Sequence, residues 1–424
     1  MVPSGWKRKL LVKVAEIRTG VAKGKKGLKD PIEVPYLRVA NVQDGHIDLT
    51  EIKTIEIERH QLERYSLLKG DVLMTEGGDF DKLGRGDVWQ SQITPCLNQN
   101  HVFAVRVDKS EMEPYFLAAL SGSHYGKTYF LSCAKRSTNL ASINSTQLKQ
   151  FPVLLPPLPE QRKISQVLST WDKAICTTER LIDNSKRQKK ALMQQLLTGN
   201  LRLLSDSGER FEGEWEEVHF NDVLKTLTDY TANGSFAALA ENVKVYDEPN
   251  HALWIMGRTL KSGNYEEQVR YTDEQGYEFL KKTKLFGGEL LMPKTGDVGK
   301  AYLLPYLNQK VTLADNVFLL DFTDQILNSF ARYFINSEHF QNQLRRTMYG
   351  TSQQTIVKKE LRRMQVLFPA VDEQEKIVKT LNNADKEIEL LEQQLADLKQ
   401  EKKGLMQQLL TGKRRVKTDA MEVA

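Results

Sequence analysis

PPLPEQRKI at residues 156–164 and PAVDEQEKI at residues 369–377 each lie in a long stretch that ends in the same residues, LMQQLLTG. The two stretches, residues 148–199 and 361–412, align without a gap at an offset of 213 positions. A match of this length within one chain indicates an internal duplication. The duplicated stretch is therefore the element around which we predict the fold.

Apolar residues recur in both copies at alternating steps of four and three, the pattern typical of a left-handed coiled coil. Gly199 and Gly412 follow the periodic runs, where a left-handed residue commonly ends a helix. Each copy therefore predicts one helix of about 38 residues, about 57 Å long at about 1.5 Å per residue. The expected seam residues are Ile164, Leu168, Trp171, Ile175, Ile182, Leu192 and Leu196 in the first copy, and Ile377, Leu381, Ile388, Leu391, Leu395, Leu398, Leu405 and Leu409 in the second.

An amphipathic helix of this length exposes its apolar stripe unless it finds a partner, so we expect the two helices to pair. The alternative is that each stripe packs only on its neighbouring globular domain. Lys189 and Lys402 hold equivalent seam positions, where a lysine commonly extends its ammonium group to solvent but can also fix the register of the coiled coil at some cost in stability. Asp372 is expected to cap the second helix in place of the prolines that precede the first.

The composition is that of a globular chain without a membrane segment. The 424 residues are 40% hydrophobic, and no stretch approaches the run of about 20 apolar residues that spans a membrane. The N-terminus lacks the apolar core of a signal peptide, and the three cysteines are too far apart for a CxxC site. A reducing cytoplasm is the expected location. The net charge of +5 is too small to indicate nucleic-acid binding by itself.

The duplication extends beyond the helices, since Trp6 and Trp215 begin similar stretches and later landmarks follow in the same order. Short β-branched and aromatic runs at 34–39, 71–74, 102–107, 290–292 and 317–320 predict strands, and runs at 115–120 and 326–334 predict helices. The expected fold class is α+β, with two mixed α/β domains joined by two long helices in an antiparallel coiled coil of pseudo-twofold symmetry. The expected divisions are a first domain at 1–147, the first repeat at 148–199, a linker at 200–214, a second domain at 215–357, the second repeat at 358–412 and a basic, solvated tail at 413–424.

Motifs of enzyme active sites are missing from the sequence. The stretch 122–128, GSHYGKT, resembles a phosphate-binding loop but has one residue too few between its glycines. The seven histidines show no metal-ligand spacing, and no GxGxxG or GxSxG motif is present. We therefore expect a binding protein without catalytic or metal-ligating residues.

The repeated PxxxEQ motif, followed each time by a helix that ends in LLTG, closely resembles the specificity subunit of type I restriction-modification systems. The resemblance implies two target-recognition domains, each reading one half of a split, asymmetric DNA site. It also implies that the coiled coil sets the spacing and helps to dock two modification (methyltransferase) subunits. Restriction subunits for endonuclease and translocase activity complete such phage-defence systems. S-adenosylmethionine, ATP and Mg²⁺ are expected on the partner subunits, in a bacterial or archaeal cytoplasm.

Contacts with DNA phosphates and bases are expected from basic and aromatic residues near glycine-rich turns or just before each long helix. In the first domain the candidates are Lys23, Lys25, Lys26, Lys29, Lys82, Arg85, Lys135 and Arg136. In the second domain they are Arg258, Lys294, Arg345, Arg346 and Tyr349. Two other functions stay open on the residues alone: a coiled-coil scaffold for proteins that does not recognise DNA, and a stand-alone DNA enzyme with an unrecognised site.

Overall fold

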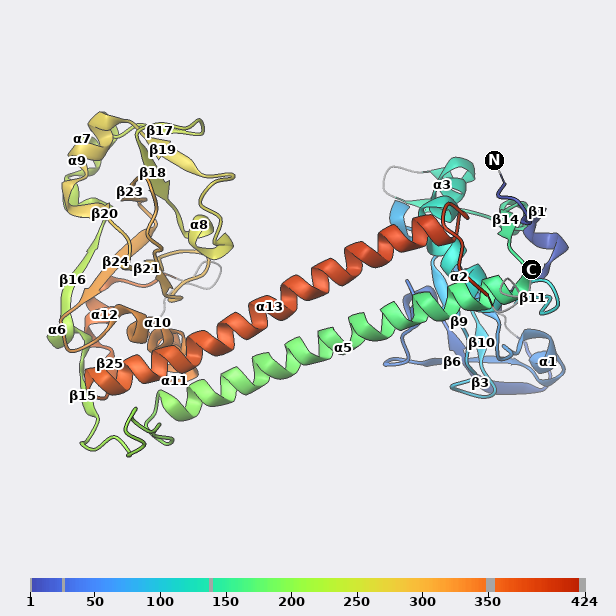
Figure 1. Ribbon diagram of the computed structural model, residues 1–424, viewed down its shortest axis with the longest axis horizontal. Coiled ribbons are helices and arrows are strands. Elements are labelled where there is room, and N and C mark those ends of the chain that lie inside the picture. The colour runs from blue at the N-terminus through green and yellow to red at the C-terminus, as the bar shows by residue number, and fades with distance from the viewer. Residues whose placement is uncertain (1, 25–26, 137–139, 348–354, 419–424) are drawn as a thin grey trace. The chain divides into compact units, whose positions relative to one another are not determined.

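In the computed structural model, the chain forms two compact units, each with its own sheets and hydrophobic core (Figure 1). Unit 1 comprises Met1–Arg180 and Gln393–Ala424, and unit 2 comprises Leu181–Glu392. The structure describes residues 2–24, 27–136, 140–347 and 355–418. Two long helices, α5 (Leu158–Leu196) and α13 (Val371–Leu409), contribute residues to both units.

The centre of unit 1 is a four-stranded antiparallel sheet in the order β2-β11-β7-β9. Its strands span Ala15–Thr19 (β2), Val102–Val107 (β11), Val72–Thr75 (β7) and Gly86–Val88 (β9). Every residue of β7 is buried, so this strand is covered on both faces. The strands predicted at 71–74 and 102–107 are confirmed as the two central strands of the sheet.

Smaller sheets and short helices complete unit 1. The remaining strands are β1 (Lys7–Leu10), β3 (Pro31–Leu37), β4 (Val42–Gln43), β5 (His46–Ile47), β6 (Lys53–Glu58), β8 (Gly77–Gly78), β10 (Leu97–Asn98), β12 (Lys135–Arg136), β13 (Ala141–Ser142) and β14 (Pro152–Leu155). The helices are α1 (Leu62–Tyr65), α2 (Pro114–Gly122), α3 (His124–Cys133) and α4 (Ser145–Lys149). The core between α2, α3 and the central sheet contains fully buried Phe116 and Phe130.

Unit 2 has a central four-stranded antiparallel sheet in the order β16-β24-β21-β22 and a separate five-stranded sheet in the order β17-β19-β18-β23-β20. Its strands are β15 (Glu216–His219), β16 (Leu224–Asp229), β17 (Val245–Tyr246), β18 (Ala252–Ile255), β19 (Arg270–Thr272), β20 (Lys284–Leu285), β21 (Leu290–Pro293), β22 (Tyr302–Leu303), β23 (Lys310–Leu313), β24 (Val317–Phe322) and β25 (Gln365–Phe368). Its short helices are α6 (Phe220–Val223), α7 (Phe236–Asn242), α8 (Gly257–Ser262), α9 (Glu274–Phe279), α10 (Asn328–Asn336), α11 (Glu338–Arg345) and α12 (Lys358–Arg363). Both units are thus mixtures of helix and sheet, as the sequence predicts.

The two long helices have the predicted length and stops. Each spans 39 residues, and the glycines just beyond them have positive φ, 71° at Gly199 and 68° at Gly412. None of the predicted seam residues is exposed. The expected cap at Asp372 is wrong, because this residue lies inside the first turn of α13, which begins at Val371. Its carboxylate is placed near the positive end of the helix dipole instead.

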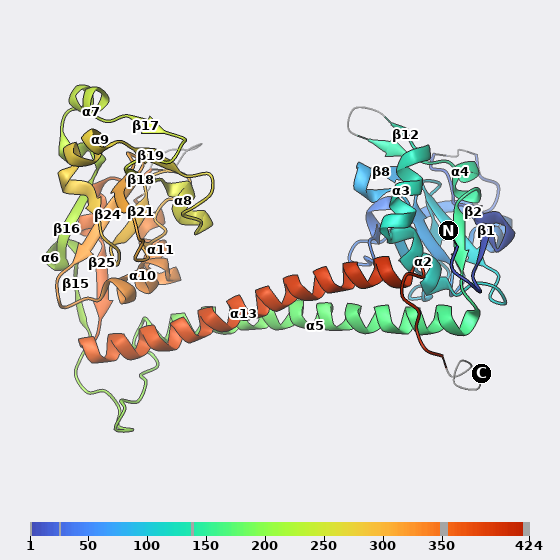
Figure 2. The same cartoon turned by 45° about the horizontal axis from the view of Figure 1, so that its top comes forward.

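Within each unit, α5 and α13 lie side by side (Figure 1 and Figure 2), and ion pairs link the two helices. In unit 1, Glu179 pairs with Lys399 at 2.8 Å and Asp172 pairs with Lys402. In unit 2, Lys186 pairs with Glu392 at 2.6 Å and Lys189 pairs with Asp385. In both units, residues that come later along α5 pair with residues that come earlier along α13, so the two helices run in opposite directions.

The EQ dipeptide of the repeated motif is buried at the start of each long helix. Gln161 accepts a hydrogen bond from the backbone N–H of Glu113 at 2.9 Å and donates to Glu111 O, so it anchors the segment that leads into α2. Gln374 does the same before α10, accepting from Leu327 N and donating to Gln325 O. A fully buried amide is stable only when its hydrogen bonds are satisfied, which explains the glutamine in both copies.

The preceding glutamate binds an arginine that follows each LLTG. Glu373 is 1% exposed and accepts from Arg202, whose Nε lies 3.0 Å from Oε1. In unit 1, Glu160 is equally buried and accepts from Arg415, with Nη2 2.7 Å from Oε2. Arg415 also donates to Ser4 O at 2.8 Å and lies 5.7 Å from the centroid of the Trp6 ring.

The expectation of a solvated tail after Gly412 holds for Lys413 and Arg414, which are exposed, but is wrong for Arg415 and Val416. Arg415 is held by a buried carboxylate, and Val416 packs against the core of unit 1. A buried carboxylate requires a cationic partner, and the tail supplies it. No helix in the described part of the chain is long and apolar enough to cross a membrane.

Candidate nucleic-acid interface

A groove of about 500 Å³ lies at one end of the central sheet of unit 1. Its lining includes Glu76, His101, Lys135 and Arg136. β7 and β11 bring the first two together: Glu76 follows β7, His101 precedes β11, and Glu76 N–H donates to His101 O at 3.0 Å. Nδ1 of His101 lies 2.5 Å from a carboxylate oxygen of Glu76.

Glycines close the groove on the side of β8. A side chain at Gly77 would place its Cβ 2.8 Å from the backbone oxygen of Ala141, so only glycine allows β8 to pair with β13 at this point. This pairing brings β12, the partner of β13, beside β8. Lys135 and Arg136, which form β12, thereby reach the groove and are both exposed.

Three of the predicted contacts in unit 1 are grouped around this groove. Arg136 lies 6.0 Å from the Phe80 ring centroid and donates to Leu131 O at 2.7 Å. Lys82, in the same turn as Phe80, pairs with Asp79 and packs over Gly78. Together with Lys135, these residues form a cationic surface that can contact phosphates.

The other predicted residues of unit 1 are not part of this group. Nε of Arg85 is buried and has no hydrogen-bond partner among the described residues, so the side chain is partly withdrawn from solvent. Lys23 lies 5.6 Å from the centroid of the Tyr36 ring, on a different sheet, and Lys29 is exposed. Lys25 and Lys26 lie outside the described residues.

Unit 2 places a different cluster at the equivalent end of its central sheet. Lys294 follows β21, and its backbone N–H donates to Asn316 O at 2.8 Å just before β24. Its ammonium lies 2.7 Å from Asp229 Oδ2, at the end of β16. Lys358, in the first turn of α12, lies 3.0 Å from the other oxygen of Asp229. Two ammonium groups around one carboxylate leave a net positive charge.

The charge state of Asp229 depends on this cluster. Its side chain is only 7% exposed, and burial by itself raises the pKa. Hydrogen bonds from Lys294, Thr231 and Lys358 outweigh the burial and lower the pKa of Asp229 from 3.8 to about 2. The contribution of Asp229 to stability is therefore present above pH 3.8 and is lost as the pH falls toward about 2.

We predict that Asp229→Asn lowers the free energy of unfolding by about 2 kcal/mol at pH 7, because the carboxylate no longer balances two lysines. The difference from the unchanged chain should shrink below pH 4 and disappear near pH 2. Urea unfolding between pH 2 and 7 measures this. Asp324→Asn, at an exposed aspartate, is the matched control; a difference that is the same at every pH would contradict the prediction.

The remaining predicted residues of unit 2 do not join Lys294. Arg258 is exposed in the first turn of α8. Arg345 ends α11 and lines a groove beside the long helices, together with Lys190 and Glu338. Arg346 follows α11 and is exposed. Tyr349 lies outside the described residues.

That groove, of about 900 Å³, runs between α11 and the two long helices of unit 2. Unit 1 has a groove of about 1030 Å³ between the start of α3 and the same pair of helices. The residues that line the two grooves on the helices correspond at the repeat offset: Lys186, Lys189, Lys190, Met193, Gln194, Asp385, Ile388 and Glu392 in unit 2, and Lys399, Lys402, Lys403, Met406, Gln407, Asp172, Ile175 and Glu179 in unit 1.

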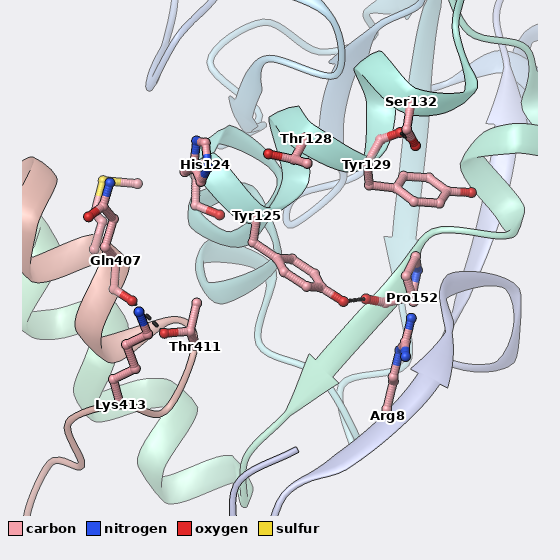
Figure 3. A pocket seen from close by; sticks show the side chains of 12 residues that line it. Arg8, His124, Tyr125, Thr128, Tyr129, Ser132, Pro152, Gln407, Thr411 and Lys413 are labelled. Carbon is pink, nitrogen blue, oxygen red and sulfur yellow. Dashed lines mark hydrogen bonds between the residues drawn. The ribbon is translucent and has the colours of Figure 1, made fainter. Parts of the chain in front are cut away.

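A neighbouring pocket of about 570 Å³ extends the groove of unit 1 past α3 (Figure 3). Tyr125 stands at its centre and donates from its hydroxyl to Pro152 O at 2.6 Å. Arg8 from β1 and Lys413, just after α13, lie on either side of this ring (Figure 3). The pocket therefore has an aromatic floor and positively charged edges.

Comparisons with known proteins give the family. The model of the type I restriction modification DNA specificity domain matches residues 3–184 and again residues 212–400. The chain belongs to this family. A specificity subunit from Methanocaldococcus jannaschii, provisionally named type I restriction enzyme MjaX specificity subunit, is 27% identical over 98% of this chain and 95% of its own length. The EcoKI specificity subunit of Escherichia coli is 26% identical over 45% of this chain and 40% of its own length.

Solved structures of low identity share the fold of this specificity subunit. A chain from a study of complex assembly and conformational transition of the type I restriction-modification system has a TM-score of 0.62 and 16% identity, covering 97% of this chain and 98% of its own. The HsdS subunit from Thermoanaerobacter tengcongensis has a TM-score of 0.51 at 16% identity, over 97% and 98% of the two chains. The resemblance stated from the PxxxEQ and LLTG motifs is confirmed. Specificity subunits are not the catalytic components, so the expectation of a non-catalytic chain also holds.

Two groups of residues at the candidate interface were missed from the sequence. Neither Glu76 nor His101 is a lysine or an arginine, and only their adjacency across β7 and β11 relates them. Asp229 and Lys358 come together with Lys294 from three separate elements. No cluster of His, Cys, Asp or Glu in the described ranges is suited to hold a metal ion.

Proposed function

We propose that this specificity subunit reads a split, asymmetric DNA site, unit 1 reading one half and unit 2 the other. The observation that carries the proposal is the double match to a DNA specificity domain, once in each half of the chain. Each unit also presents cationic side chains beside its central sheet, Lys135 and Arg136 in one and Lys294 and Lys358 in the other. Because the clusters differ chemically, the half-sites should differ too.

We further propose that α5 and α13 form an antiparallel coiled coil, that the chain arose by internal duplication, and that the coil sets the distance between the half-sites. The seam, of which no predicted residue is exposed, the opposite helix directions and the repeated ion pairs support this. A reader built from two similar halves meets two half-sites at a separation that its own geometry defines. The division into domains at residues 147, 199, 214 and 357 stays a prediction.

Partnership with other subunits of a restriction-modification system follows from the family, and the matching grooves beside the long helices suggest a stoichiometry. Each groove has the same lysines, the same methionine and the same acidic residues at the repeat offset. We propose that each accepts one modification subunit, two in all. S-adenosylmethionine, ATP and Mg²⁺ would bind to partner subunits in this arrangement, and a cytoplasmic location stays a prediction.

A DNA mobility shift with and without a co-expressed modification subunit tests the function. Binding that weakens with salt and becomes selective for one split sequence is expected of a specificity subunit. Absence of DNA binding under both conditions would favour the protein scaffold, and DNA modification or cleavage by the purified chain alone would favour an enzyme.

We predict that replacing residues 1–147 by the corresponding domain of another specificity subunit changes one half-site and leaves the other unchanged. The reason is that unit 1 and unit 2 have separate sheets and cores. Sequencing of methylated DNA from cells that express the complex gives the site of each variant. An exchange that altered both halves would contradict separate reading.

A further inference from the structure

We propose that Glu76, oriented by His101, reads a cytosine in the half-site of unit 1 by accepting a hydrogen bond from the N4 amino group in the major groove. The inference rests on the proposed function and names one base contact within it. Glu76 lies in the groove between the strand ends and β12, with its side chain 29% exposed. It is therefore accessible to a ligand while held in place.

The surrounding charges make a carboxylate at this point unusual. Lys135 and Arg136 line the same groove, and Lys82 lies over neighbouring Gly78. These cations suit the DNA phosphates. The same phosphates repel a carboxylate that faces DNA, unless the carboxylate gains a specific hydrogen bond. The exposed amino group of a base is the donor that such a carboxylate can accept from.

The geometry also separates cytosine from adenine. Cytosine presents its N4 amino group in the major groove, where Glu and Asp are its usual partners. Adenine presents its amino group beside the acceptor N7, and N7 would repel a carboxylate. This pair of a donor and an acceptor instead suits the amide of Asn or Gln. His101 occupies one carboxylate oxygen of Glu76, at 2.5 Å, and leaves lone pairs of the carboxylate for the base.

The same position in unit 2 carries the opposite charge. Glu76 follows β7, and its backbone N–H donates to the backbone oxygen of His101, just before β11. Lys294 follows β21, and its backbone N–H donates to the backbone oxygen of Asn316, just before β24. An acceptor in one unit and a donor in the other is the difference expected if this position takes part in distinguishing two unlike half-sites.

The test uses the chain co-expressed with its modification subunit and compares the DNA sites that are methylated and bound. Glu76→Gln should change the preference at one position of one half-site from cytosine toward adenine, because glutamine pairs with N6 and N7 of adenine. Binding to the original site should fall about tenfold. His101→Asn should weaken discrimination at the same position, since Glu76 loses the partner that orients it.

Two control sets separate base reading from general effects. Glu63→Gln removes an exposed carboxylate of α1 and should leave the site unchanged. Lys135→Ala and Arg136→Ala should weaken binding to all sequences alike and reduce its dependence on salt. Thermal unfolding of each variant complex shows whether unit 1 remains folded.

The outcomes distinguish this inference from the proposed function. If the unchanged complex has no sequence preference, the proposed function fails. If the unchanged complex is selective and both Glu76→Gln and His101→Asn leave every position of the site as it was, only the reading by Glu76 is overturned. A changed preference confined to the half-site of unit 2 would overturn it as well.

Discussion

Arg202→Ala is expected to lower the free energy of unfolding by about 3–5 kcal/mol, because it leaves the carboxylate of Glu373 buried without its cation. Glu373 is 1% exposed, and Arg202 is the side chain that binds it from the segment after α5. Urea unfolding of the chain at neutral pH measures the loss. Arg210→Ala, at an exposed arginine of the same segment, should change the stability by less than about 0.5 kcal/mol.

The corresponding change in unit 1, Arg415→Ala, should cost less. Glu160 keeps a second donor, the indole N–H of Trp6 at 3.2 Å, whereas the indole nitrogen of Trp215 in unit 2 is buried and has no hydrogen-bond partner in the described part of the chain. We therefore expect a loss of about 2–3 kcal/mol. Arg414→Ala is the control, since Arg414 is an exposed neighbour.

A double variant tests whether the unpaired charge is the cause. Glu373→Gln combined with Arg202→Ala removes both charges, so it should be more stable than Arg202→Ala alone. If the double variant is as unstable as the single one, lost packing of the arginine would explain the effect, and the account given for this pair would be wrong.

The second large effect concerns the spacing of the half-sites. Inserting 21 residues in heptad register after Ile182 in α5 and after Leu395 in α13 should lengthen the paired helices by about 31 Å. At about 3.4 Å per base pair, this adds about 9 base pairs, close to a full turn of about 10.5. Both half-sites should then stay on nearly the same face of the DNA, and the methylated site should have a longer gap.

Two related insertions serve as controls. Seven residues in each helix add about 10 Å, or about 3 base pairs at about 3.4 Å each, which turns the second half-site about a third of the way round the duplex. Binding should therefore be weaker than with 21 residues. An insertion into α5 alone moves Lys186 and Lys189 away from Glu392 and Asp385, and should impair folding. An unchanged gap after the paired 21-residue insertion would refute the role of the helices as spacer.

The long helices could be predicted from the sequence because their signals are local. The heptad pattern, the prolines before each run and the glycines after it all lie within the elements that they define. The central strands, such as 102–107, were recognised for the same reason. The cap assigned to Asp372 failed because α13 begins one residue before it, and helix boundaries depend on the backbone of the preceding turn.

The contacts between distant residues could not be predicted in this way. Arg415 pairs with Glu160 across 255 positions, and nothing in the local pattern of the tail indicates a buried partner. The repeat itself held the missing signal, since Arg202 and Arg415 correspond at the same offset as Glu373 and Glu160. The candidate interface shows the same limit: Lys82, Lys135 and Arg136 are grouped, but Arg345 lies beside the long helices because α11 ends there.

The composition of unit 1 from two separate stretches affects the order in which the chain can fold during synthesis. Unit 2 is continuous, so its residues leave the ribosome in one uninterrupted run. Unit 1, in contrast, needs Gln393–Ala424 to complete its core and to supply Arg415. The first part of unit 1 lacks its second part until roughly 200 further residues have been synthesised, which takes on the order of 10 to 40 s at about 5–20 residues per second. Unit 1 is therefore begun before unit 2 and completed after it, and a premature stop between Glu392 and Gln393 would leave the core of unit 1 incomplete.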